Sequence, residues 1–275
     1  MSKQQAIELA EVCRGAATSV AAGLREVFRS NMDVEYKRDV HDQVTEHDRA
    51  CEAAITDFLT SRWPGARVVG EEFGAAGDGD VTFYIDPIDG TTNFVQGLAF
   101  FCTSVGAAVN GKLVAGAIYN PISDELFSAD AEDAWLNGEK LVAKDALPAG
   151  AATLITGYPT AADYQADGEL AGEIFADLVE NFSSLRRTGS GALGLCHVAA
   201  GWTDAVLNAS TSPWDVAAGI QILRNAGGLY RPLWYSRERG PIQDAPAYFA
   251  TGPGGDYPAL TRAAEKIVEN RTKTG

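Results

Sequence analysis

Near the start of the chain, apolar residues recur at helical spacing. Over residues 4–29 they stand three or four positions apart, which predicts one long amphipathic helix. A second helix is predicted to begin at Thr45, because residues 45–48 (Thr-Glu-His-Asp) resemble a capping box in which Asp replaces the usual Glu. Residues 66–70 then predict a short strand, and the glycine-rich residues 74–80 predict a flexible loop.

Turn signals in the middle of the chain predict antiparallel strands. Residues 81–85 (Val-Thr-Phe-Tyr-Ile) have the composition of a strand. The apolar segments 103–109 and 113–119 flank Asn110-Gly111, which is a strong hairpin signal. A second Asn-Gly pair, at 137–138, marks another tight turn.

Small residues and a proline at 146–152 mark the expected domain boundary, which divides the chain into residues 1–150 and 151–275. Beyond this boundary, strand and helix patterns alternate. The expected strands are 153–158, 184–188, 204–208 and 248–251, and the expected helices end at 181, span 191–200 and 213–226, and close the chain. The predicted class is a mixed α and β protein built in layers.

The amino-acid composition indicates a globular protein and excludes several other kinds. The chain has 275 residues, of which 46% are hydrophobic, so a large core is expected and collagen or disorder is excluded. There is no apolar run of about 18 residues and no apolar signal core at the N-terminus, so we expect a cytoplasmic protein without membrane contact. The four cysteines include no CxxC pair and are expected to be reduced and mostly buried: Cys13, Cys51, Cys102 and Cys196.

The net charge of the chain excludes some kinds of binding partner. The 37 Asp and Glu outnumber the 22 Lys and Arg, which leaves a net charge of −15. A field of this sign repels nucleic acid and anionic lipid, so we expect neither as a partner. It would also repel a phosphorylated metabolite unless cations were held in the binding site.

Candidate chemistry begins at residues 86–94 (Asp-Pro-Ile-Asp-Gly-Thr-Thr-Asn-Phe), where a strand is expected to end and a helix to begin. The proline fixes φ and the glycine permits a sharp turn, so the carboxylates of Asp86 and Asp89 should converge, as suits a magnesium ion. The amides of Gly90 and Thr91 would face an anion at the helix N-terminus. A helix-capping turn with solvated acids is an equal alternative for this motif taken alone.

Two more acidic segments follow the same pattern. Gly70-Glu71-Glu72 comes after a predicted strand, and Trp214-Asp215 opens a predicted helix. Taken singly, Glu71 could be a solvated strand end, and Asp215 could simply stabilise the helix dipole. The order of the three acidic segments along the chain favours a shared site.

Five segments together resemble the motifs of the inositol monophosphatase family, the magnesium-dependent, lithium-sensitive phosphomonoesterases. They are Lys37 with residues 42–48, residues 70–74, residues 86–94, residues 186–192 with Gly191 in place of an alanine, and residues 213–219. The resemblance covers nearly the whole chain. It implies a five-layer α/β/α/β/α sandwich that is usually a homodimer, with the site between the halves.

The resemblance also implies a set of ligands. Glu71, Asp86 and the carbonyl of Ile88 would hold one Mg²⁺, and Asp86, Asp89 and Asp215 a second; a third, weaker ion near Glu71 is common in the family. Thr91 and Glu71 would orient the attacking water, and the ion near Asp215 would stabilise the leaving alkoxide. The implied substrate contacts are Asp89, Gly90, Thr91, Gly189, Ser190, Gly191, Asn208 and Asp215.

The expected function is therefore hydrolysis of a small phosphate monoester, with inositol 1-phosphate as the leading substrate. Fructose 1,6-bisphosphate, histidinol phosphate and 3′-phosphoadenosine 5′-phosphate remain alternatives, as does a regulatory or assembly factor that uses the same fold. Asn208 stands where inositol-specific relatives usually carry a glutamate. This difference predicts broader or redirected specificity, with a strand-end role for Asn208 as the alternative.

Two other signals carry less weight. Residues 189–194 fit G-x-G-x-x-G, but residues 185–188 do not have the composition of the buried parallel strand that a dinucleotide site requires. His197 is expected to pack inside a helix, and His41 and His47 are expected at the surface.

Overall fold

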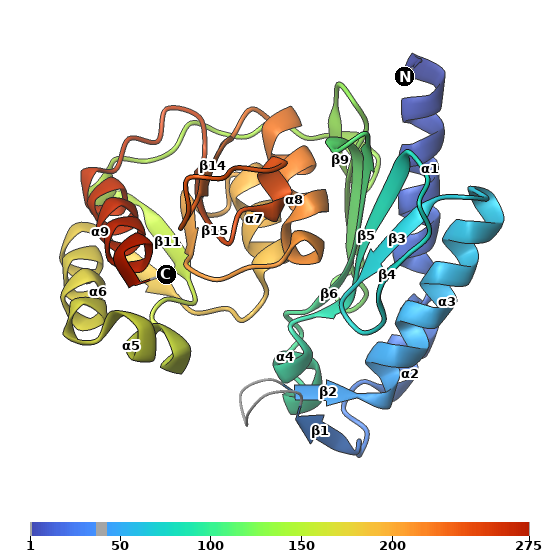
Figure 1. Ribbon diagram of the computed structural model, residues 1–275, viewed down its shortest axis with the longest axis horizontal. Helices are drawn as coiled ribbons and strands as arrows, with labels where there is room; N and C mark the ends of the chain where they lie inside the picture. Colours follow the sequence, from blue (N-terminus) through green and yellow to red (C-terminus); the bar gives the residue numbers. More distant parts are fainter. Residues whose placement is uncertain (1, 37–42, 275) are drawn as a thin grey trace.

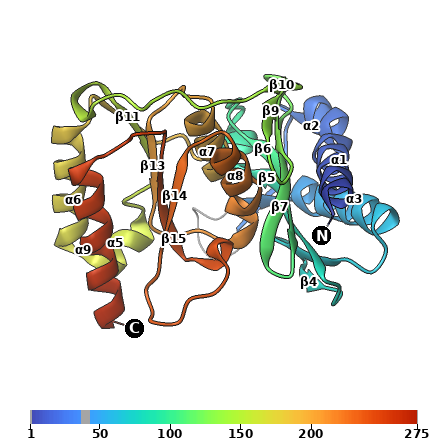
Figure 2. The ribbon, with the colours of Figure 1, turned by 90° about the horizontal axis from the view of Figure 1, so that it is seen from above.

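Two β-sheets stand between three layers of helices in the computed structural model, which describes residues 2–36 and 43–274 (Figure 1). Viewed from above, the layers follow one another as helix, sheet, helix, sheet and helix (Figure 2). The predicted five-layer sandwich is therefore confirmed.

The first sheet has eight strands in the order β10-β9-β8-β7-β6-β5-β3-β4. All neighbours pair antiparallel except β3 and β5, which are parallel. The strands are β3 (Arg67–Gly70), β4 (Gly74–Ala76), β5 (Val81–Asp89), β6 (Cys102–Val109), β7 (Lys112–Asn120), β8 (Glu125–Ala129), β9 (Ala134–Leu136) and β10 (Glu139–Lys140). A separate pair consists of β1 (Val34–Tyr36) and β2 (Gln43–Thr45). The hairpin predicted at Asn110-Gly111 is confirmed, whereas the loop expected at residues 74–80 begins with β4.

The outer helices of the first sheet bury an apolar face against it. They are α1 (Lys3–Ser19), α2 (Ala21–Val27) and α3 (Glu46–Arg62). The single helix expected over residues 4–29 is wrong, because the chain leaves the helix at Val20. The hydroxyls of Thr18 and Ser19 donate back to the carbonyls of Arg14 and Ala16, at 2.8 and 2.7 Å, and such bonds compete with the helical ladder.

The second sheet has five strands in the order β12-β11-β13-β15-β14. These are β11 (Thr153–Thr156), β12 (Ser184–Arg186), β13 (Ala205–Asn208), β14 (Leu229–Leu233) and β15 (Ala247–Thr251). Helices α5 (Ala161–Asp167), α6 (Glu169–Asn181) and α9 (Pro258–Thr274) cover its far face, and short 3₁₀ turns lie at Ala149–Ala151 and Ile242–Asp244. The expected helix that ends at residue 181 is interrupted at Gly168, and β14 was not predicted.

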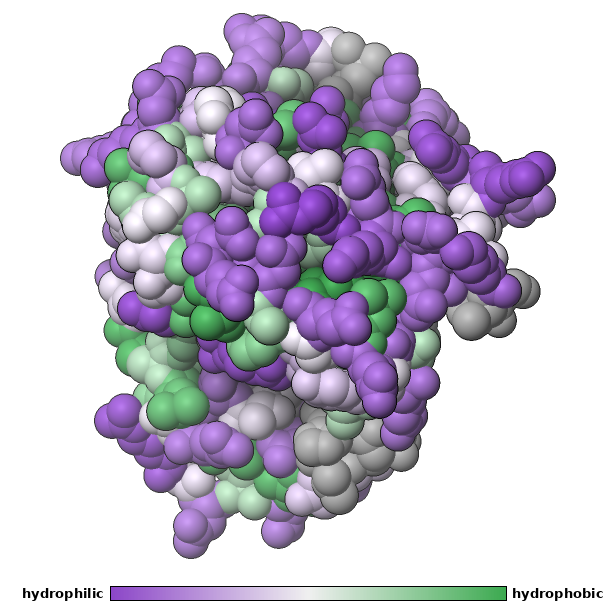
Figure 3. Space-filling model, turned by 90° about the vertical axis from the view of Figure 1, so that its left-hand side faces the viewer, coloured by the Kyte–Doolittle hydropathy of each residue, from purple (hydrophilic) through white to green (hydrophobic). Residues whose placement is uncertain are grey.

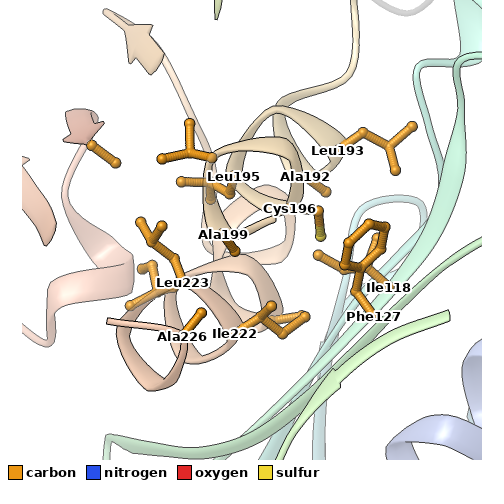
Figure 4. Packing of buried hydrophobic residues seen from close by; sticks show 14 of the residues in the cluster. Ile118, Phe127, Ala192, Leu193, Leu195, Cys196, Ala199, Ile222, Leu223 and Ala226 are labelled. Carbon is orange, nitrogen blue, oxygen red and sulfur yellow. The ribbon is translucent and has the colours of Figure 1, made fainter. Parts of the chain in front are cut away.

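Helices α7 (Gly191–Ala199) and α8 (Pro213–Asn225) form the middle layer. Their apolar side chains meet those of both sheets in one core. In Figure 4, Cys196 of α7 and Ile222 of α8 lie near Ile118 and Phe127 of the first sheet. Because this layer is shared, the two halves of the chain pack against a common interior, and the proposed division near residue 150 stays a prediction.

The outer face of the second sheet's helices is mostly hydrophilic. On the face that carries α5, α6 and α9, apolar side chains form small groups among hydrophilic ones (Figure 3). Over the described residues, no helix combines the length and the apolar character needed to cross a membrane. The four cysteines are free; Cys51 is partly exposed and the other three are buried.

Candidate functional site: an acidic cavity between the two sheets

Strand β5 runs through the acidic segment and ends at Asp89, four residues beyond its expected end. Asp86 pairs with Ser104 of β6, and Asp89 pairs with Cys102, so three steps along β5 match two along β6. This is a β-bulge, and Pro87, which lacks an N–H group, lies inside it. In a regular strand, side chains three positions apart point to opposite faces. The bulge shifts this alternation, and both carboxylates reach the same cavity.

The cavity has a volume of about 280 Å³, and every site residue expected from the sequence lines it. Its wall combines segments from both halves of the chain. The expected residues are Glu71, Asp86, Ile88, Asp89, Gly90, Thr91, Gly189, Ser190, Gly191, Asn208 and Asp215, and the further ones are Ile155, Gly157, Thr188, Ser210 and Thr211. Four carboxylates therefore face one another across a small space, and no Lys or Arg is among the described residues that line it.

The pKa values in the cavity reflect this crowding. Burial, followed by the charges of Glu71 and Asp89, raises the pKa of Asp86 well above its usual range. Burial and the charge of Asp89 raise the pKa of Asp215 to about 7. A cavity that holds several carboxylates under such mutual repulsion favours a bound cation.

Asp89 joins the two halves of the site. Its carboxylate accepts hydrogen bonds from the Ser190 hydroxyl and from the amides of Gly191 and Ala192, the latter at 3.3 and 2.8 Å. These groups form the N-terminus of α7, which favours a negative charge. Burial raises the pKa of Asp89, although these hydrogen bonds oppose the increase.

Asp215 both caps a helix and faces the cavity. Its Oδ2 atom accepts hydrogen bonds from the Ser212 amide at 2.8 Å and from the Thr211 hydroxyl at 3.1 Å, so it is the helix N-terminal acid that the simpler interpretation predicted. Asp215 also lines the cavity. The two interpretations of this residue are therefore compatible.

Thr91, at the start of α4 (Thr91–Gln96), is held by a residue that sequence reasoning did not place in the site. Its hydroxyl lies 2.9 Å from Oδ1 of Asp48 and 3.0 Å from the carbonyl of Ile88. The other oxygen of Asp48 accepts from the amide and hydroxyl of Thr45, which confirms the predicted capping box. The capping box is visible in the sequence, whereas the contact that the second oxygen of Asp48 makes with Thr91 depends on the fold.

Two further buried residues support the walls of the cavity. Glu52, one helical turn after Asp48 in α3, accepts hydrogen bonds from the amides of Glu72 and Phe73. Asn93 donates to the carbonyls of Phe100 and Thr188, both at 2.7 Å, and so ties α4 to the turn that precedes α7. The available signal for Glu52 was its spacing of four from Asp48, which places both carboxylates on one face of a helix.

Asn208 is positioned by a tyrosine behind it. Its Nδ2 atom donates to the Tyr248 hydroxyl at 2.8 Å, and its Oδ1 atom accepts from the Gly157 amide at 3.5 Å. The side chain thus lines the cavity as a held, neutral amide at the end of β13.

The donor set fits a hard divalent cation. Carboxylate oxygens and the carbonyl of Ile88 are the ligand types that Mg²⁺ prefers. Within residues 2–36 and 43–274, no three acidic, histidine or cysteine side chains are already arranged as a closed metal site. The carboxylates surround the cavity instead of meeting at one point.

The structure also shows the surroundings of the G-x-G-x-x-G segment and of two histidines. The strand expected at residues 184–188 is β12, which is parallel to β11; as expected, it is not the buried strand of a dinucleotide site, because it is an edge strand whose residues are half-buried or exposed. His197 packs edge-on against Phe100 and Trp202, and burial lowers its pKa, as expected for a packing residue. His47 is half-buried with its ring edge-on to Phe94. Lys37, His41 and Asp42 lie outside the described residues.

Comparison with known proteins shows first the fold of this chain and then its family. An inositol monophosphatase from Anabaena (Nostoc) has the same fold, with a TM-score of 0.77, 28% identity and 95% of each chain covered. Residues 5–250 match the sequence model of the Inositol monophosphatase family, and the chain belongs to that family. It is 38% identical to Inositol monophosphatase 2 of Solanum lycopersicum over 81% of this chain and 86% of the relative. It is 37% identical to Nus factor SuhB of Pasteurella multocida over 70% of this chain and 72% of the relative.

Proposed function

We propose that this protein is a magnesium-dependent phosphatase that hydrolyses a small phosphate monoester, with inositol 1-phosphate as its leading substrate. The observation that carries the proposal is the cavity in which four carboxylates face one another without a lining Lys or Arg among the described residues. A phosphate dianion could enter such a cavity only after divalent cations had reversed the local charge. Membership of the Inositol monophosphatase family supports the same chemistry.

The residues have distinct proposed roles in holding the ions. Glu71, Asp86 and the carbonyl of Ile88 would hold one Mg²⁺, and Asp86, Asp89 and Asp215 a second, with a third, weaker ion near Glu71. Bound Mg²⁺ would supply positive charge and Lewis acidity to the phosphate and to water. The Ile88 carbonyl lies 3.0 Å from the Thr91 hydroxyl, and a carbonyl oxygen has two lone pairs, one of which could contact a cation.

Thr91 and Asp48 would orient the water that attacks the phosphate. When the Thr91 hydroxyl donates its hydrogen bond to Asp48, at 2.9 Å, and not to the Ile88 carbonyl, a lone pair on Oγ1 can accept a hydrogen bond from water. Glu71 would help to orient that water for in-line attack on phosphorus. The backbone at Gly90 and at residues 189–191, together with Asp89 and Asp215, would position the phosphate and the hydroxyls of the substrate.

Phosphate release from a panel of phosphomonoesters, with and without Mg²⁺, tests this function. We expect turnover to require Mg²⁺ and to stop in excess EDTA. Ca²⁺ should substitute poorly, because it is larger and tolerates loose coordination that would leave the water unaligned. Full turnover in excess EDTA would rule out the metal mechanism.

Asn208 makes the choice of substrate testable. A glutamate at this position would accept charge-assisted hydrogen bonds from substrate hydroxyls, whereas the neutral amide of Asn208 forms weaker ones. We expect Asn208→Glu to raise kcat/KM for inositol 1-phosphate relative to sugar phosphates. If the ratios between substrates do not change, Asn208 does not determine specificity.

Two alternatives remain as proposals. A bisphosphate such as fructose 1,6-bisphosphate is disfavoured because the described lining offers its second phosphate no Lys or Arg. A regulatory factor is the second alternative, because a relative is named Nus factor SuhB. Phosphate turnover that is lost with the acidic residues would favour the enzyme. The proposed homodimer can be measured by light scattering during gel filtration.

A further inference from the structure

The turn that carries Glu71 is built around a buried carboxylate. Residues 71–73 connect β3 to β4, which pair antiparallel through Gly70 and Gly74. Glu52 of α3 lies behind this turn and is only 1% exposed. Its Oε2 atom accepts from the Glu72 amide at 2.7 Å, and its Oε1 atom accepts from the Phe73 amide at 3.0 Å.

These two bonds complete a continuous anchor on the backbone around Glu71. The Glu71 amide donates to the carbonyl of Ile85 at 3.3 Å, one residue before Asp86. Three consecutive amides are therefore fixed, the first to β5 and the next two to α3. This arrangement sets the position of the Glu71 backbone relative to Asp86.

Gly70 provides the room for this carboxylate. A Cβ atom added to Gly70 would overlap the carboxyl group of Glu52. Its φ angle is not in the left-handed region, so the close approach of Glu52 is the constraint that excludes a side chain here. The sequence thus provides both parts of the contact, a carboxylate on α3 and a gap at the end of β3.

We propose that Glu52 is a positioning residue for metal binding, which holds the Glu71 turn in place through the Glu72 and Phe73 amides. The inference rests on the proposed function, because it assumes that Glu71 is a ligand. Partners that orient ligands typically change metal affinity by about 10- to 100-fold when they are removed. Glu52 contacts neither the cavity nor a substrate, so its effect must pass through the turn.

Two substitutions disturb the contact in different ways. Glu52→Gln keeps the size but replaces one acceptor oxygen with an NH₂ group that opposes a backbone N–H. Gly70→Ala leaves the Glu52 charge in place and displaces the carboxylate by steric overlap. Asp57→Asn is the matched control, because Asp57 is an exposed carboxylate on the same helix.

The test is direct Mn²⁺ binding to the metal-free protein, followed by electron paramagnetic resonance, with urea unfolding as the measure of folding. We expect about a 10-fold or greater loss of Mn²⁺ affinity in both E52Q and G70A, and wild-type affinity in D57N. The double variant E52Q/G70A should bind no more weakly than the weaker single variant, because both changes remove one contact. Phosphate release should then require correspondingly more Mg²⁺.

Three results would overturn the proposed role of Glu52, and a fourth would overturn the proposed function. Wild-type affinity in folded G70A would overturn the inference, since a loss seen in E52Q alone would then reflect only the removed charge. Additive losses in the double variant, or a loss of equal size in D57N, would overturn it as well. If E52Q does not fold, G70A alone decides. If the wild-type protein binds no Mn²⁺, the proposed function itself fails.

Discussion

Asp86 lies where the repulsion within the cavity is greatest. Its pKa is raised by burial and by the charges of Glu71, Asp89 and Asp215. An ionised carboxylate in this position is unfavourable for folding unless a cation or a proton compensates its charge. It is also the residue that would contact both proposed ions.

Replacing Asp86 with Asn should therefore separate function from stability. We expect Asp86→Asn to lower kcat/KM by about 100-fold or more at a fixed Mg²⁺ concentration, because one lost charge weakens two metal sites. The metal-free protein should be at least as stable to urea as wild type, because repulsion among the carboxylates falls. Asp145→Asn, at an exposed position, is the control. Wild-type kcat/KM in D86N would contradict the ligand assignment.

Thr91 allows the proton step to be separated from metal binding. Thr91→Ala removes the hydroxyl that bonds to Asp48, and we expect kcat to fall by about 100-fold while Mn²⁺ affinity stays near wild type. Thr91→Ser keeps the hydroxyl and should retain most of the activity. The measurement is kcat at saturating Mg²⁺ together with Mn²⁺ binding. An equal loss of metal affinity in T91A would assign Thr91 to the metal site instead.

At the scale of elements, the position of α8 decides where Asp215 lies. The helix packs directly on β7, where a Cβ atom on Gly116 would come within 2.6 Å of the Cα atom of Ala218. Gly116 therefore permits the close approach of a helix whose first turn carries Asp215. A change in the sheet at this point should move the carboxylate.

We expect Gly116→Ala to lower the free energy of unfolding by about 1–3 kcal/mol, because it adds volume to a packed interface. It should also weaken Mn²⁺ binding, since α8 must shift. Gly23→Ala is the matched control: Gly23 lies exposed in α2, and a Cβ atom added there would meet no atom within 4 Å. This change should be neutral or stabilising by about 0.5–1 kcal/mol. Urea unfolding of both variants gives the comparison, and equal stability would contradict the packing argument.

At the scale of the whole molecule, the last helix is tied to the rest of the protein by a buried ion network. The Arg271 guanidinium of α9 contacts the carboxylates of Asp163 and Asp167 in α5, each at 2.6 Å, and donates to the carbonyl of Ala209 at 2.8 Å. Ala209 stands between two residues that line the cavity. Burial alone would raise the pKa of Asp167, but hydrogen bonds from Arg271 and Asn270 lower it below its usual value.

This network predicts an acid-sensitive contribution to stability. Because the pKa of Asp167 is lower in the folded protein than in the unfolded chain, its contribution is present at neutral pH and is lost as the pH falls through the folded value. Arg271→Gln leaves the carboxylates buried without that cation and should cost about 3–5 kcal/mol near neutral pH. In this variant, burial should raise the pKa of Asp167, so protonation on acidification relieves part of the cost.

The difference between wild type and R271Q should therefore shrink as the pH falls from about 7 to about 4. Urea unfolding at several pH values measures it. Arg262→Gln on the same helix is the control, because the Arg262–Asp177 pair is partly exposed and should contribute no more than about 1 kcal/mol. A difference for R271Q that does not change with pH would contradict the assignment to Asp167.

Local patterns in the sequence were sufficient for many elements. Three predictions are confirmed because they depend on contacts between near neighbours. They are the capping box at Thr45, the hairpin at Asn110-Gly111 and the helix expected at residues 191–200, which is α7. β14 was missed because it is an edge strand that contains Pro232, which weakens its strand pattern. The end of β5 was misjudged because the bulge depends on pairing with β6.

The sequence by itself determined the family, the layered class and most of the residues that line the cavity, because these are carried by short motifs and by the periodicity of apolar positions. Only the tertiary structure decided how those residues are held. Asp48 reaches Thr91 from 43 positions away, and Asn93 reaches Thr188 from 95 positions away. The side chain of Glu52 fits against Gly70 because α3 crosses the end of β3 at that point. Such contacts depend on how whole elements pack, and no local pattern in the chain encodes that packing.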